Sequence, residues 1–150
     1  MEADLLTVDD PRETDRLAIL DLLVHFNNRS AGPTSALALA ILLKDAAGRT
    51  IGGLWGANGY DWLFIELLFV PDALRGRNFG RAMMHRAEAI AVQRGCIGVW
   101  LNTFSFQSRG FYEKLGYRIF GEITDHPAGG ALYFLQKRLS DEENGTSTPP

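Results

Sequence analysis

The stretch from residue 62 to residue 94 constrains the fold of this chain more than any other part. It opens at 62–70 with a run of aromatic and branched residues in which Glu66 is the only charged side chain. Such a run is typical of a strand that is buried on both faces. A turn at 71–74 and a loop rich in arginine and glycine follow, and they lead directly into a helical pattern that continues to residue 94.

The helical pattern has one apolar face and one polar face, because residues of each kind recur at spacings near 3.6. The apolar face carries Phe79, Met83, Ala87, Ile90 and Ala91, and the polar face carries Arg81, His85 and Glu88. We therefore expect an amphipathic helix that packs against a sheet.

The loop before this helix has the features of an anion site. The first N–H groups of a helix have no partner within the helix, and the helix dipole adds partial positive charge there. Gly76 and Gly80 let a backbone come close to a ligand, and Arg75, Arg77 and Arg81 add full charges. A phosphate or pyrophosphate group fits such a place, although an ordinary strand, turn and helix with a basic cap has the same pattern.

This segment resembles the central motif of the GNAT superfamily of acyl-CoA N-acyltransferases. In that motif a strand that ends in Val is followed by [Q/R]-x-x-G-x-[G/A] and a helix, and here the loop reads R-G-R-N-F-G at 75–80. Asn78 replaces the first motif glycine, and asparagine tolerates left-handed backbone better than other non-glycine residues. We therefore expect the loop to form despite the replacement.

A second segment is similar to another GNAT signature, A-x-x-F-Y-E-K-x-G-F. The chain reads S-R-G-F-Y-E-K-L-G-Y at 108–117, with Ser108 in the place of the usual alanine. The preceding T-F-S-F-Q at 103–107 resembles small bacterial members of the family. Two signatures in the right order and at the right separation are far more specific than either one alone.

The resemblance covers residues 3–139 and implies a mixed α/β fold. Its centre is a mostly antiparallel sheet with one parallel, splayed strand pair and flanking helices. The patterns along the chain predict strands at 3–8, 35–44, 51–55, 62–70, 96–104, 117–124 and 131–137, and a short helix through 111–115. One domain is expected over 1–139, followed by a disordered tail at 140–150, which has no apolar residue.

A first helix is predicted to run to about Asn28. Asp10 is its expected N-cap, with Pro11 at the first helical position and Glu13 at the third. The expected buried stripe of this helix consists of Leu17, Leu20, Leu23, Val24 and Phe26.

The resemblance implies acyl transfer from a thioester to an amine, in which the amine must be neutral and the leaving thiolate benefits from a proton. Glu66 matches the strand position from which an acidic residue often acts as general base in the family, commonly through water. The alternative is a Glu66 that pairs with an arginine at a strand edge. Tyr112 matches the family tyrosine near the cofactor sulfur, and its phenol would protonate the thiolate. The alternative is a half-buried tyrosine that bonds a backbone carbonyl.

The implied acyl donor is acetyl-CoA, and transfer would be direct within a ternary complex. The main chain of Leu68, Phe69 and Val70 would run alongside the pantetheine arm, with an N–H near Leu68 polarising the thioester carbonyl, if the two parallel strands separate after about residue 68. The residues expected at the pyrophosphate are Arg75, Gly76, Arg77, Asn78, Phe79, Gly80 and Arg81.

The acceptor is expected to be an amine of a small molecule or a peptide, and its identity is not readable from the sequence. By the resemblance, His25, Asn28 and His126 are candidates to contact it. The alternatives are an ordinary helix-surface or partly buried residue for His25 and a plain surface loop residue for His126. Two other functions are open: an acyl-CoA sensor without catalysis, and an interaction domain that keeps the fold without the cofactor.

Composition excludes several other classes. A net charge of −3 and a pI near 5.6 give no basic footprint for nucleic acid. No apolar run approaches the length of a membrane span, so a cytoplasmic protein is expected. The single Cys96 rules out an intrachain disulfide, and the three scattered histidines, His25, His85 and His126, imply no metal site. A homodimer is left open.

Overall fold

The computed structural model describes residues 1–34 and 36–139. The chain divides into two compact units, Met1–Thr34 and Ser35–Pro150. The tail expected at 140–150 lies outside the described residues, and the single domain over 1–139 stays a prediction. None of the helices in the described ranges is long and apolar enough to cross a membrane.

The N-terminal unit contains one helix, α1 (Glu13–Ala31). Residues 1–8 form no strand, so the strand predicted at 3–8 is wrong. The helix also begins later than expected, with Arg12 rather than Asp10 at the N-cap. The reason is that the Asp15 carboxylate accepts the backbone N–H of Arg12 at 2.8 Å, so Asp15 supplies the side-chain acceptor of the first turn.

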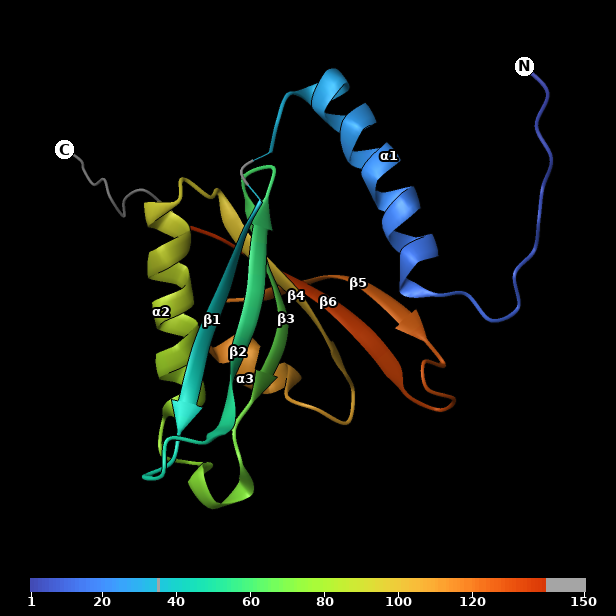
Figure 1. The fold of residues 1–150 in the computed structure, drawn as a ribbon. Coiled ribbons are helices and arrows are strands. Elements are labelled where there is room, and N and C mark those ends of the chain that lie inside the picture. The colour runs from blue at the N-terminus through green and yellow to red at the C-terminus, as the bar shows by residue number, and fades with distance from the viewer. Residues whose placement is uncertain (35, 140–150) are drawn as a thin grey trace. The chain divides into compact units, whose positions relative to one another are not determined.

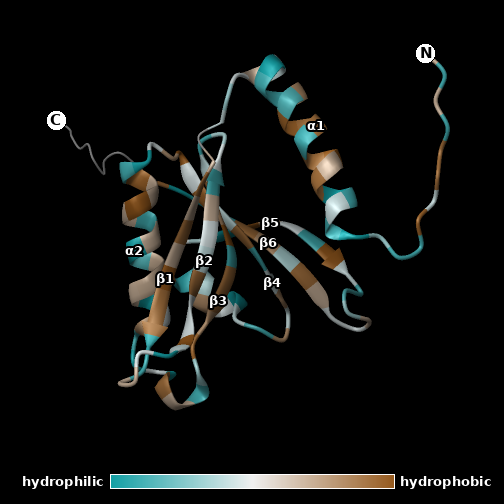
Figure 2. Ribbon diagram, viewed as in Figure 1, coloured by the Kyte–Doolittle hydropathy of each residue, from teal (hydrophilic) through white to brown (hydrophobic). Residues whose placement is uncertain are grey.

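The buried stripe predicted for α1 is not formed within the N-terminal unit, and it stays a prediction. No residue of α1 is buried, and all five apolar side chains of the stripe are exposed. Hydrophobic and hydrophilic residues are interspersed along the helix (Figure 2). A single helix has no second layer within its own unit against which to bury a face.

The second unit contains a six-stranded sheet with the order β1-β2-β3-β4-β6-β5 (Figure 1). The strands are β1 (Leu37–Lys44), β2 (Thr50–Gly59), β3 (Trp62–Phe69), β4 (Gly98–Phe104), β5 (Arg118–Thr124) and β6 (Ala131–Arg138). Only β3 and β4 pair in parallel, and every other neighbouring pair is antiparallel. The predicted mostly antiparallel sheet with one parallel pair is confirmed.

The helices of this unit lie at the predicted places. A 3₁₀ turn (Asp72–Leu74) follows β3, α2 (Phe79–Gln93) connects β3 to β4, and α3 (Arg109–Lys114) follows β4. The core consists of α2 and α3 residues packed with those of the sheet, including Met83, Met84, Ala87, Ala91 and Tyr112 from the helices, and Leu54, Leu63, Ile65, Val99, Leu101 and Leu135 from the strands.

Glu88 is buried in α2, so its predicted place on the polar face is wrong. Its carboxylate accepts a hydrogen bond from the Tyr117 hydroxyl at 2.7 Å and another from the Lys137 ammonium at 3.0 Å. A buried carboxylate is tolerated when both oxygens are paired in this way. Burial, reinforced by the nearby Glu88 charge, raises the pKa of Tyr117. The three side chains connect α2, the residue before β5, and β6.

A bulge divides β3 into two halves with different neighbours. In the antiparallel pairing, Trp55 of β2 lies opposite Leu67 and Gly56 lies opposite Ile65, so Glu66 is the extra residue. The parallel pairing with β4 ends at Ile65, earlier than the expected separation after about residue 68. Beyond Ile65, β3 therefore follows β2 and leaves β4.

The bulge also shifts which side chains of β3 face the core. Leu63 and Ile65 are buried before it, whereas Leu68 and Val70 pack against the core after it. Leu67 and Phe69 are 60% and 55% exposed as a result. The prediction that this strand is buried on both faces is wrong for its second half, because the face that carries Leu67 and Phe69 is left exposed.

We predict that Tyr117→Phe destabilises the protein by about 1–3 kcal/mol, because the buried Glu88 carboxylate loses a donor. Tyr112→Phe is the matched control: Tyr112 is also buried, but its hydroxyl has no hydrogen-bond partner among the described residues. The free energies of unfolding would be measured in urea. Equal losses in the two variants would show that the bond to Glu88 contributes nothing to stability.

Candidate active site

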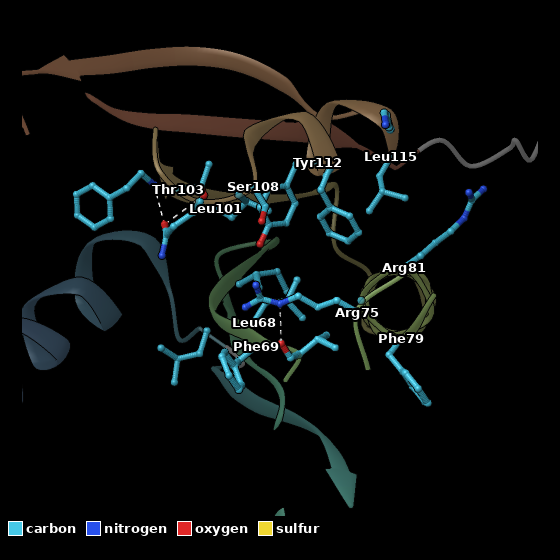
Figure 3. Close-up of a pocket in the computed structure, with 18 of the residues that line it drawn as sticks. Leu68, Phe69, Arg75, Phe79, Arg81, Leu101, Thr103, Ser108, Tyr112 and Leu115 are labelled. Atoms are coloured by element: carbon cyan, nitrogen blue, oxygen red, sulfur yellow. Dashed lines mark hydrogen bonds between the residues drawn. The ribbon is translucent and has the colours of Figure 1, made fainter. Parts of the chain in front are cut away.

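A groove of about 750 Å³ opens where β3 and β4 separate (Figure 3). Residues 65–70 form one wall and residues 101–104 form the other. The loop before α2 and the first residues of α2 close one end of the groove. Residues between 106 and 115, from α3 and the loop that precedes it, line the rest. This volume is typical of a site for a small molecule or cofactor.

Most residues predicted to bind the cofactor line this one groove. They are Leu68, Phe69, Val70, Arg75, Gly76, Asn78, Phe79, Gly80 and Arg81. Arg77 does not line it, and its guanidinium instead lies 5.6 Å from the centre of the Phe79 ring. The structure thus brings together nine of these ten positions, whose role in binding stays a prediction.

Asn78 adopts the left-handed conformation that the loop requires. Its φ is 67° and its ψ is 14°, and it is the N-cap residue of α2. Its carbonyl oxygen accepts the N–H of Ala82 at 2.9 Å, the first hydrogen bond of the helix. The expectation that the loop forms with asparagine in place of glycine is confirmed.

The two glycines of the loop differ in what they permit. Gly76 has a φ of 78°, a left-handed backbone conformation that favours glycine. No atom lies within 4 Å of where its Cβ would be, so a side chain there would meet no steric obstacle. At Gly80 a Cβ would lie 3.2 Å from the Phe111 ring. Gly80 therefore allows the start of α2 to approach α3.

The arginines at this end of the groove are held differently. Arg75 donates from Nε to the Val70 carbonyl at 3.1 Å and forms an ion pair with Asp72 at 2.9 Å. Arg81 has no ion-pair partner within 4.0 Å in the described part of the chain. Arg81 and the free N–H groups of the first turn of α2 make this end of the groove positive, whereas Asp72 offsets the charge of Arg75.

Tyr112 projects from α3 into the middle of the groove (Figure 3). It is only 8% exposed, and its ring lies edge-on to the rings of Phe111 and Tyr117. The alternative of a hydroxyl bonded to a backbone carbonyl is not found among the described residues. Burial raises the pKa of Tyr112 to about 12, so the phenol is protonated and available as a donor at neutral pH.

Glu66 lines the groove from the β3 wall. It is exposed, because it is the extra residue of the bulge, and not buried in an apolar strand as its sequence context suggested. No arginine lies within ion-pair distance of it among the described residues. The alternative of an arginine-paired Glu66 is therefore not found there, and a role as base stays a prediction.

The three residues predicted to contact the acceptor lie in two units. His126, in the loop between β5 and β6, packs edge-on against Phe104 with 5.2 Å between ring centres, and Phe104 lines the groove. His25 and Asn28 lie in α1, in the N-terminal unit. Roles in acceptor binding stay predictions for all three. In residues 1–34 and 36–139, no group of three or more His, Cys, Asp or Glu side chains could hold a metal ion.

Sequence reasoning missed the polar residues on the β4 side of the groove, Asn102, Thr103 and Gln107. Gln107 Oε1 accepts hydrogen bonds from the Phe104 N–H at 2.7 Å and from the Thr103 hydroxyl at 3.2 Å. The available signal was the T-F-S-F-Q segment itself, which places a glutamine shortly after a strand that ends at the site.

A splayed parallel strand pair, a loop rich in arginine and glycine, and a tyrosine on a short helix meet at this groove. A model of the acetyltransferase (GNAT) family matches residues 5–117. The chain belongs to this family. The predicted family and fold are confirmed, and the protein is an acetyltransferase enzyme.

Two relatives and one solved structure illustrate the similarity. An acetyltransferase from Agrobacterium fabrum is 32% identical over 122 residues, which cover 81% of this chain and 89% of that protein. The blasticidin-S acetyltransferase of Streptomyces morookaense is 41% identical over 93 residues, which cover 61% of this chain and 68% of that protein. The crystal structure of a protein from Agrobacterium tumefaciens matches with a TM-score of 0.87 at 29% identity, over 91% of this chain and all of that one.

We predict that Asn78→Val destabilises the protein by about 1–2 kcal/mol, because a β-branched residue is strained in left-handed backbone. Asn78→Gly, which restores the family glycine, is expected to be as stable as the natural protein or more so. Urea unfolding of the three proteins would measure both effects. If the valine variant were as stable as the glycine variant, the left-handed conformation of residue 78 would be wrong.

Proposed function

We propose that this enzyme transfers the acetyl group of acetyl-CoA to a primary amine of a small molecule, by direct transfer in a ternary complex. The observation that carries the proposal is the groove between β3 and β4, which joins a positive anion loop at one end to a protonated tyrosine at its middle. Acetyl-CoA has the matching order of groups: a diphosphate, an amide-containing arm and a thioester. An aminoglycoside 6'-N-acetyltransferase of the same fold was solved with coenzyme A.

The separated part of β3 supports the placement of the arm. The β4-facing edge of this strand has no strand partner beyond Ile65, and backbone N–H and C=O groups need partners when water is excluded. The two amides of a pantetheine arm would meet this need alongside Leu68, Phe69 and Val70. The diphosphate would lie on the N–H groups of Gly76 to Gly80, with Arg75 and Arg81 adding charge.

In the proposed reaction the amine nitrogen forms a bond to the acetyl carbon, and the bond from that carbon to sulfur breaks. Glu66, directly or through water, takes the proton that the amine loses. The N–H of Leu68 would stabilise charge on the carbonyl oxygen. Tyr112 gives its proton to the leaving thiolate, for which its raised pKa keeps it protonated.

The acceptor class is proposed from the relatives. The blasticidin-S acetyltransferase is the relative whose name states a substrate, and its similarity spans two thirds of its length. We therefore take a small-molecule amine, with blasticidin S as the first compound to test, over a peptide amine. His25, Asn28 and His126 are the residues proposed to contact it.

We predict that acetyl-CoA raises the melting temperature by several degrees, because a ligand at about 100 times its Kd stabilises a protein by about 2.7 kcal/mol. Free adenosine is the control and is expected to cause no shift. Thermal unfolding would be followed with each ligand at millimolar concentration. No shift with acetyl-CoA would contradict acetyl-CoA as the acyl donor. A shift without release of CoA in the presence of small-molecule amines would contradict the proposed acceptor class.

We predict that Tyr112→Phe lowers kcat by about 100-fold or more, the usual loss for a general acid, and leaves acetyl-CoA binding unchanged. Because the pKa of Tyr112 is raised to about 12, its phenol stays protonated through pH 10, so kcat of the natural enzyme should not fall between pH 7 and about 10. Glu66→Gln should lower kcat by a similar factor through loss of the base.

The matched control for the tyrosine variant is Tyr60→Phe, in the turn between β2 and β3. CoA release would be measured for the three variants over this pH range. Full activity of the Tyr112 variant would contradict its role as acid, and full activity of the Glu66 variant would contradict the role of Glu66 as base.

A further inference from the structure

The side chain of Gln107 is fixed with its amide nitrogen free. Gln107 lines the groove, and its Oε1 accepts both the Phe104 N–H at 2.7 Å and the Thr103 hydroxyl at 3.2 Å. A backbone N–H can only donate, so the oxygen of the side chain must face it and the NH₂ group must face the other way. That NH₂ group has no hydrogen-bond partner in the described part of the chain.

The support for this orientation is rigid. Thr103 is 3% exposed, and Phe104 is the last residue of β4, where it pairs with Leu132 of β6. Both donors to Gln107 therefore belong to the sheet and not to a loose loop. A side chain held by two such bonds loses little further freedom when it binds a ligand, so the bond it offers is worth more.

The fixed donor lies away from the anion loop. In Figure 3, Thr103 lies on one side of Tyr112, whereas Arg81 and Phe79 lie on the other. In the proposed complex, acetyl-CoA has its diphosphate at the arginine end and reaches Tyr112 from that side. The part of the groove beyond Tyr112, where Thr103 holds Gln107, is thus left for the acceptor.

We propose that Gln107 is a specificity-determining residue, whose Nε2 donates a hydrogen bond to an oxygen of the acceptor. The inference rests on the proposed function and deepens it. The acceptor is an amine with a carbonyl or hydroxyl oxygen beside the reactive nitrogen: Glu66 on the β3 wall takes the proton of the amine, and Gln107 on the β4 side binds the oxygen. Gln107 is exposed in the groove, so an amine without that oxygen leaves its NH₂ group to water and gains no hydrogen bond from it.

The decisive variant is Gln107→Glu. A carboxylate keeps an oxygen for the Phe104 N–H and the Thr103 hydroxyl, but its second oxygen cannot donate. Gln93→Glu makes the same chemical change at the last residue of α2, outside the groove, and is the matched control. CoA release would be measured with blasticidin S, kanamycin, spermidine and a glycyl peptide, and the best acceptor would be used for full kinetics.

For Gln107→Glu, kcat/KM for the best acceptor should fall about 10- to 100-fold, the value of one hydrogen bond to a substrate oxygen, with most of the change in KM of the amine. The KM of acetyl-CoA and the melting temperature should match those of Gln93→Glu. Spermidine, which has no oxygen, should be the poorest acceptor of the natural enzyme and the one least affected by the substitution.

The inference would be overturned by an unchanged kcat/KM in Gln107→Glu or by a preference for spermidine over the acceptors that contain oxygen. A parallel change in the KM of acetyl-CoA would also overturn it, because Gln107 would then bind acetyl-CoA and not the amine. Failure of the proposed function would look different. In that case the natural enzyme would release no CoA with any of the four amines, and the inference would fall with it.

Discussion

The end of the hydrogen bonding between β3 and β4 is the constraint on which the site depends. Up to Ile65 and Leu101 the two strands pair as an ordinary parallel pair, and beyond them β3 stays with β2 while β4 stays with β6. Each strand thus keeps one partner, so the sheet remains intact on both sides of the opening. A groove with backbone on its walls results, and no helix or loop has to move to create it.

The two helices that border this groove are tied to one another through the core. The loop at 75–78 leads into α2 and Tyr112 belongs to α3, and Gly80 against Phe111 sets the space between the helices. The buried Glu88 of α2 binds Tyr117, whose own N–H bonds the Tyr112 carbonyl at 3.1 Å. Core contacts therefore fix the position of the phenol relative to the loop.

The sequence predicted what local patterns encode, and failed where distant residues decide. Apolar runs and turn residues were enough to place the strands after residue 35 and the parallel pair, although β2 extends to Gly59 and not only to residue 55 as predicted. The R-G-R-N-F-G loop lies at one end of the groove, and its binding of an anion stays a prediction. Helical spacing predicted Glu88 on the polar face. This prediction failed because the partners that allow its burial, Tyr117 and Lys137, lie far along the chain. Nothing local marked Glu66 as an extra residue, and nothing showed that Gln107 would fold back on Phe104.

Because of the bulge at Glu66, the groove depends on the number of residues in β3 as well as on their identity. One additional residue in β3 reverses the faces of all that follows, which turns Leu68 and Val70 toward the core and Leu67 and Phe69 away from it. A shorter strand with any side chains at these places would keep its alternation and could continue to pair with β4. Insertion or deletion of a single codon, more than substitution, is thus the kind of genetic change that opens or closes a site of this design.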